Sequence, residues 1–226
     1  MKFLLFLEKN YCGNGLMMIA TLAALVVSLR YYNRHKDLRI FTYYILFSFL
    51  QDLTEFFAPA VKMDKITSRI ILAYSENAFM LFEFFVCNYF ILQHLSSARR
   101  RMAVKVNALI FFCLLLYMGL RYYKVIYLRS FFLFEAIFLV LPCLLYFYEL
   151  FVNVRPEPLK NQPSFWIITG ILFLNACSIP MLLTVGLLGK YSQAAFFLNF
   201  ILYSIFFILI IRAYLCTPIN QSAHAG

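Results

Sequence analysis

Long apolar runs separated by short polar segments dominate this chain. A membrane-spanning helix needs about 20 mostly apolar residues, and the runs cover residues 10–29, 40–61, 70–92, 106–120, 130–151, 164–188 and 191–211. The fourth run is short, and Lys105 could lengthen it by extending its charged head to the membrane surface. The runs lack the alternation of barrel strands. The pattern therefore predicts an all-α polytopic membrane protein in which residues 1–226 form a single domain of seven transmembrane helices.

Composition and charge favour the same class. The chain is 64% hydrophobic and 13% charged, whereas soluble domains contain about 25% charged residues. A net charge of +10 could indicate nucleic-acid binding, but the basic residues gather between the apolar runs. Bases in such positions set topology and meet anionic lipid headgroups. We therefore expect a lipid bilayer as a partner and no nucleic acid.

The distribution of lysine and arginine predicts the orientation. Cytoplasmic connections carry an excess of these residues. Eleven fall on the side of the first connection and nine on the other. The margin is small, but the first connection alone contains Arg30, Arg34, Lys36 and Arg39. We therefore expect the N-terminus outside and the C-terminus inside.

Six of the ten acidic residues fall inside the predicted spans, namely Asp52, Glu55, Glu76, Glu83, Glu135 and Glu149. A carboxylate at the bilayer centre costs about 2.5–3.5 kcal/mol, so such residues usually face a bundle interior or a wet cavity. The predicted orientation puts Glu83 near mid-membrane and Glu149 at the inner interface. It puts the other four in the outer half.

These positions predict a ligand- or ion-binding pocket that opens outward. Its candidate residues are Asp52, Glu55, Glu76, Glu83, Glu135 and Asn77. Alternatively, the acids form ion pairs that fix helix packing, and Arg69, Arg121 and Arg129 are the candidate counter-charges. They could also line a proton or cation path, pair with a partner helix, or include an acid/base pair, Asp52 and Glu83, acting on lipid.

Other chemistry finds little support in the sequence. The cysteines are scattered without a CxxC pair, and no histidine has a metal-ligand partner at helical spacing. HExxH, GxSxG and Walker motifs are absent. The last run has no lysine for a retinal Schiff base. We therefore expect no metal, no cofactor and no enzymatic activity. Pro142 and Pro180 fall within two of the runs and are predicted to kink their helices.

Four stretches resemble a known group of membrane proteins. They read RIFTYYILFSFLQDLTEFF (39–57), NAFMLFEFF (77–85), PSFWIITGILFLNACSIP (163–180) and LNFILYSIFFILIIRAYL (198–215). Together they resemble seven-helix membrane proteins of Bacteroidetes-type bacteria, in some of which a similar region is the sensory input domain of a histidine kinase. The resemblance implies a multi-pass protein of the bacterial inner membrane. No kinase domain follows the last run, so a signal would pass to a separate histidine kinase or another cytoplasmic protein.

We therefore expect a receptor-like sensory module that binds a small ligand or ion and has no effector domain of its own. The alternative is a small cation or proton transporter or channel that uses the intramembrane carboxylates. The two differ in one property, because a sensor conducts nothing and a transporter must conduct.

Overall fold

Seven α-helices make up most of the part of the chain that the structure describes. This computed structural model describes residues 11–34, 36–57, 65–121, 129–153, 158–188 and 192–216. The helices are α2 (Tyr11–Arg30), α3 (Arg39–Phe57), α4 (Lys65–His94), α5 (Ala98–Arg121), α6 (Arg129–Val152), α7 (Pro163–Leu188) and α8 (Ser192–Leu215). Two short 3-10 turns, η1 (Lys36–Leu38) and η2 (Leu159–Asn161), precede α3 and α7. These ranges contain no strand, which confirms the predicted all-α class.

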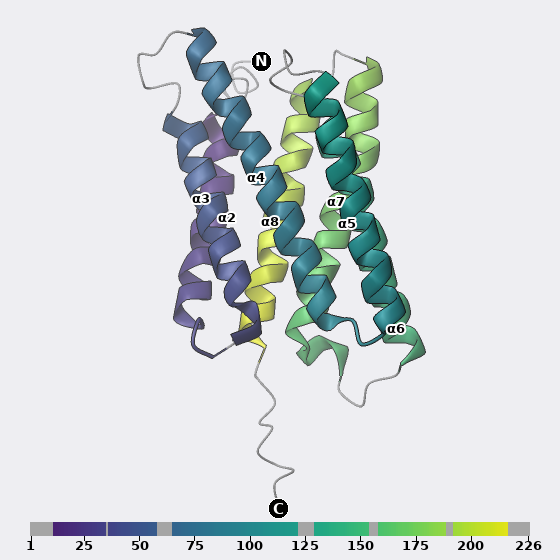
Figure 1. The fold of residues 1–226 in the computed structure, drawn as a ribbon. Coiled ribbons are helices and arrows are strands. Elements are labelled where there is room, and N and C mark those ends of the chain that lie inside the picture. The colour runs from purple at the N-terminus through teal and green to yellow at the C-terminus, as the bar shows by residue number, and fades with distance from the viewer. Residues whose placement is uncertain are drawn as a thin grey trace, which may run out of the picture.

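Six of the helices close into a ring. Consecutive helices run in opposite directions, so α2 starts at the upper end of the bundle and α8 finishes at the lower end (Figure 1). Around the ring, α2 packs on α3, α3 on α4, α4 on α6, α6 on α7, α7 on α8, and α8 on α2. The first and last of these helices are therefore neighbours.

The remaining helix, α5, lies outside the ring and packs against α4 and α6 (Figure 1). Contacts between aromatic side chains stabilise α5 in this position. Phe111 of α5 stacks on Phe84 of α4 with ring centroids 3.9 Å apart, and it also meets Phe138 of α6 at 5.5 Å. Its outer surface exposes Leu109, Leu116 and other large apolar side chains, as expected for a helix that faces lipid.

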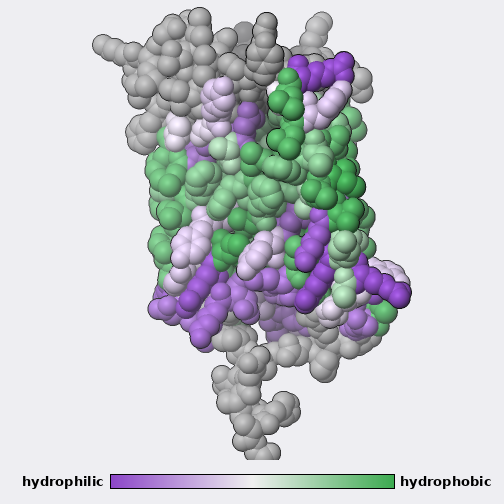
Figure 2. Space-filling model, viewed as in Figure 1, coloured by the Kyte–Doolittle hydropathy of each residue, from purple (hydrophilic) through white to green (hydrophobic). Residues whose placement is uncertain are grey.

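Four helical segments of the described chain are long and apolar enough to cross a membrane. They are Ala98–Arg121, Phe131–Val152, Pro163–Leu183 and Phe197–Leu215, and α2 adds a shorter apolar segment, Met17–Arg30. On the face shown in Figure 2, an apolar band crosses the middle of the bundle and hydrophilic residues gather at the lower end. These features are those of a multi-pass membrane protein.

The helix bounds follow the predicted runs, but α4 begins five residues before its run, α8 ends four residues after its run, and the start of α5 differs most. We predicted that this helix begins at residue 106, after a connection that contains Arg99, Arg101 and Lys105. It begins at Ala98 instead, about two turns earlier. Arginine and lysine are good helix formers, and their long stems can follow an apolar surface while the charged heads extend to its edge. Basic residues therefore do not mark a break in the helix here.

Both predicted kink residues lie within continuous helices. Pro142 is inside α6 and Pro180 is inside α7, and helical structure persists on both sides of each proline. The kinks themselves stay predictions.

The two helices α7 and α8 approach each other closely at Gly170. A Cβ atom at this position would lie 2.9 Å from Cδ2 of Phe206, whose side chain is fully buried. The absent side chain of Gly170 therefore makes room for the Phe206 ring.

Candidate functional site

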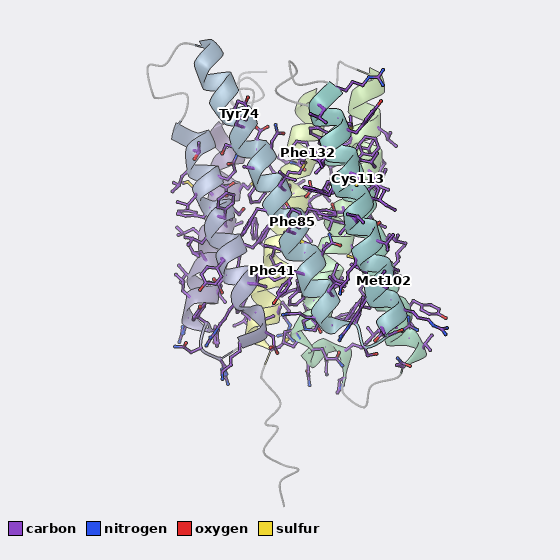
Figure 3. The ribbon with its side chains drawn as sticks, viewed as in Figure 1. Phe41, Tyr74, Phe85, Met102, Cys113 and Phe132 are labelled. Atoms are coloured by element: carbon purple, nitrogen blue, oxygen red, sulfur yellow. The ribbon has the colours of Figure 1, made fainter. Side chains whose placement is uncertain are left out.

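Two acidic residues are buried in the interior of the ring, on the neighbouring helices α4 and α6. Glu83 of α4 and Glu135 of α6 are 5% and 6% exposed, and their carboxyl groups interact electrostatically. Figure 3 helps to locate them: Phe132 marks the upper part of α6 and Phe85 the middle of α4. Glu135 lies just below Phe132 along α6, and Glu83 lies just above Phe85 along α4. We call Glu83 and Glu135 the carboxyl pair.

Residues from two further helices surround the carboxyl pair. Tyr44 of α3 is fully buried and interacts with Glu83, and Tyr203 of α8 interacts with Tyr44. Two thiols complete the surroundings: Cys87 of α4 interacts with both glutamates and with Cys143 of α6, and both cysteines are buried. Four helices of the ring thus contribute to one polar cluster.

The carboxyl pair has unused capacity to accept a proton or a cation. Oε1 of Glu135 is buried and has no hydrogen-bond partner among the described residues. A buried carboxylate oxygen without a donor is costly, and two adjacent carboxylates in an apolar interior resist carrying two negative charges. Within the described ranges no cluster of three histidine, cysteine or acidic residues suits a metal ion. Oε1 of Glu135 is therefore an acceptor to which a donor or a cation could bind.

Another predicted site residue, Asp52, participates in a different helix contact. Its carboxylate receives a hydrogen bond from the hydroxyl of Thr21, which joins α3 to α2. The neighbouring Gln51 accepts a hydrogen bond from Ser75, which joins α3 to α4. Both contacts lie nearer the upper end of the bundle than Tyr44, because α3 runs upward and these residues follow Tyr44 by about two turns.

The other predicted site residues lie on α3 and α4. Glu76 and Asn77 are half-buried on α4, about 10 Å above Glu83 along the helix axis. Glu55 is part of α3, but its side chain lies outside the described residues, as do those of Arg69 and Arg129. Arg121, the third candidate counter-charge, is exposed at the end of α5, where its guanidinium lies over the ring of Tyr117.

Glu149 lies near the lower end of the bundle and connects α6 to the start of α5. Its carboxylate accepts hydrogen bonds from the hydroxyl and the backbone N–H of Ser96, the latter at 2.6 Å. It also forms an ion pair with Arg100 at 2.8 Å. A carboxylate that receives these bonds beside the N-terminus of a helix is favourably placed. We therefore interpret Glu149 as a structural residue.

Sequence reasoning missed part of the cluster. Tyr44 is one of many aromatic residues, and the buried cysteines were interpreted as small apolar residues. No spacing rule could reveal that Cys87 and Cys143 meet, because this depends on the direct contact of α4 with α6. The one available signal was the placement of Glu83 near the middle of its predicted span.

Fold and site together define a multi-pass helical membrane protein with a buried carboxyl pair. Comparison of the chain with protein-family models, with curated proteins and with solved structures finds no match. The functional argument therefore depends on the arrangement of the residues themselves.

Proposed function

We propose that this protein is a receptor-like sensory module of the bacterial inner membrane, with seven spans, its N-terminus outside and its C-terminus inside. The carboxyl pair binds a small ligand or ion, and the bundle transmits its occupancy to a separate cytoplasmic partner. The observation that supports this most strongly is the burial of Glu83 and Glu135 together inside the ring. Intramembrane ionisable residues are costly and usually functional.

The contacts between α3 and α8 could transmit a structural change from the carboxyl pair to the lower end of the bundle. Tyr44 and Tyr203 extend the cluster to α3 and α8. At the lower end the same two helices are joined directly, because Thr42 donates to the hydroxyl of Tyr214, and Tyr214 donates to the carbonyl of Leu38, both at 2.8 Å. A shift of α3 relative to α8 at the site would therefore reach the lower surface.

The lower surface also has the charge expected of a cytoplasmic side. Its described bases lie at helix ends and in the turns there: Arg30, Arg34, Lys36, Arg39, Arg99, Arg100, Arg101, Lys105, Lys160 and Arg212. An excess of basic residues marks the cytoplasmic side of a membrane protein. This surface would meet the signalling partner, for which a histidine kinase is the candidate that the sequence resemblance suggests.

The alternative function is a proton or cation transporter or channel. The contacts Asp52–Thr21 and Gln51–Ser75 favour it, since they place polar groups between the carboxyl pair and the upper end of the bundle. A chain of polar groups of this kind is a feature of proton relays.

Two measurements on the same purified protein separate these functions. Spin labels at Phe151→Cys and Leu215→Cys, in a Cys113→Ser background, would report the spacing of the lower ends of α6 and α8. We expect this spacing to differ between the intact site and Glu83→Gln/Glu135→Gln, because a sensor must bind its ligand with different affinity in two states. In liposomes we expect no proton or sodium flux.

Flux that disappears in Glu83→Gln would favour the transporter. Unchanged spacing together with no flux would leave the sensory proposal without support. Asp37→Asn, which removes an exposed acid outside the helix bundle core, is the control for general charge effects.

A further inference from the structure

We propose that the lower rim of the bundle contains a binding site for the headgroup of an anionic phospholipid, formed by Lys160, Trp166 and Arg212. The three residues come from three adjoining elements, η2, α7 and α8. The site is separate from the carboxyl pair of α4 and α6, and binding of a lipid here does not depend on that pair.

Trp166 connects the three elements. Its indole Nε1 donates a hydrogen bond to the main-chain carbonyl of Lys160 at 2.9 Å, which holds η2 against the first turn of α7. The guanidinium of Arg212 lies over the indole ring, with Cζ 5.6 Å from the ring centroid. The thiol of Cys216, just after α8, donates to the same Lys160 carbonyl at 3.5 Å. The lower ends of η2, α7 and α8 are therefore joined at one place.

Both basic side chains of this place are exposed and can contact a phosphate group. A cation over an aromatic ring is attracted to the face of the ring, so the guanidinium of Arg212 keeps N–H donors for oxygen acceptors, and its fork matches the geometry of a phosphate. Lys160 adds an ammonium group on a flexible stem. Two positive charges favour a ligand with a net negative charge over a zwitterionic headgroup, which brings a cation of its own.

The site lies at the depth of lipid headgroups. Trp166 is in the first turn of the spanning segment Pro163–Leu183, and Arg212 is in the last turn of Phe197–Leu215. Both turns are at the lower end of the bundle (Figure 1). Tryptophan is enriched at the membrane–water interface, and arginine extends its charged head to it. Basic residues in such positions attract anionic lipids.

An exposed apolar stripe on α8 continues upward from Arg212. Ile208 and Ile201 are 61% and 41% exposed, and they precede Arg212 by four and eleven residues, which places all three on one face of the helix. An acyl chain can therefore lie along Ile208 and Ile201 while its headgroup contacts Arg212. A soluble acidic protein would not contact this stripe, so a lipid fits the site better.

Trp166 also provides the measurement, because it is the single tryptophan of the chain. The purified full-length protein is reconstituted in phosphatidylcholine vesicles that contain increasing fractions of phosphatidylglycerol with brominated acyl chains, which quench tryptophan fluorescence on contact. Brominated phosphatidylcholine is the reference lipid. We expect half-maximal quenching at a mole fraction about tenfold lower for phosphatidylglycerol, because each base near an anionic lipid adds to the attraction.

Three variants and a matched control locate this preference. Arg212→Gln should bring the phosphatidylglycerol curve close to the phosphatidylcholine curve, Lys160→Gln should move it part of the way, and Arg212→Lys, which keeps the charge, should retain most of the preference. Arg99→Gln removes an exposed base at the start of α5, which packs on α4 and α6, and should leave the preference unchanged. Each variant is compared with its own phosphatidylcholine curve, so a changed environment of Trp166 does not imitate a lost preference.

The outcomes decide between a lipid and other ligands. Lys160→Gln changes an exposed side chain and tests the site even if Arg212→Gln fails to fold. Equal quenching by the two lipids in the wild-type protein would overturn the proposal and leave these bases to a soluble acidic partner. A loss in Arg99→Gln as large as that in the site variants would assign the preference to net surface charge and also overturn the site. Inorganic phosphate that relieves the quenching as effectively as unbrominated short-chain phosphatidylglycerol would replace the lipid by a free phosphate.

Discussion

Asn107 of α5 donates a hydrogen bond from Nδ2 to the main-chain carbonyl of Phe138 in α6, at 2.7 Å. Phe138 precedes Pro142 by four residues, and in an uninterrupted helix the N–H of residue 142 would satisfy that carbonyl. Proline has no N–H, so the carbonyl loses its helical partner. A side chain from the neighbouring helix replaces the missing donor, which is one way in which membrane helices tolerate proline.

This relationship predicts a strong coupling between Asn107 and Pro142. Asn107→Leu should lower the free energy of unfolding by about 1–2 kcal/mol, because the Phe138 carbonyl is left without a donor. In a Pro142→Ala background the backbone N–H returns, and the same substitution should cost much less. A double-mutant cycle of thermal or denaturant unfolding in detergent measures the coupling. Equal costs in both backgrounds would show that Asn107 acts independently of the proline.

Gly170→Ala should destabilise the contact of α7 with α8. The new Cβ would lie 2.9 Å from Cδ2 of Phe206, a ring that is fully buried, and overpacking of this kind costs about 1–3 kcal/mol. Gly119→Ala is the matched control, since a Cβ there meets no atom within 4 Å, and alanine is a better helix former than glycine by about 1 kcal/mol. The thermal midpoints in detergent should therefore move in opposite directions.

Arg100→Gln should loosen the lower end of α5. It removes the 2.8 Å ion pair with Glu149, whose carboxylate is buried, and leaves that charge with the hydrogen bonds from Ser96 and Ser97. We expect a loss of about 1–3 kcal/mol and easier proteolysis next to Ser96. Arg99→Gln, at an exposed residue one position earlier, removes the same charge without touching Glu149 and should change stability little. Equal effects of the two variants would assign the loss to net charge.

Tyr214→Phe should separate the end of α8 from the start of α3. The hydroxyl of Tyr214 accepts from Thr42 and donates to the carbonyl of Leu38, so its removal breaks two buried hydrogen bonds, at a cost of about 1–3 kcal/mol. Tyr89→Phe, at a side chain that is 51% exposed, is the control. Thermal unfolding of both variants checks the difference, and a normal midpoint for Tyr214→Phe would mean that this junction contributes nothing to stability.

The apolar runs were sufficient to predict the helices because a helix in lipid must be both long and apolar. Their boundaries shifted most before residue 106, where Arg99, Arg100, Arg101 and Lys105 suggested a connection although these residues are good helix formers. Depth along each helix was also predictable. Glu149 lies three residues before the end of α6, because position along a helix follows from residue number alone.

The lateral arrangement of the helices was not predictable from the sequence, because it depends on which helices pack against each other. Nothing in the order of the chain indicates that α4 contacts α6 directly and leaves α5 outside the ring. The nearness of Glu83 and Glu135 depends on this contact between α4 and α6. A single sequence shows how far along its helix each polar group lies. It does not show which face of that helix packs against a neighbouring helix.

The contact between α2 and α8 constrains the order of events during synthesis. The two helices that close the ring are the first and the last that the structure describes, so the ring cannot close until the final helix has entered the bilayer. Until then the helices that contain Glu83 and Glu135 form an incomplete ring. Lipid can reach the interior of that ring from the open side. A chain that stops before residue 192 would keep that opening, and its unprotected polar interior would make it a natural substrate for membrane quality control.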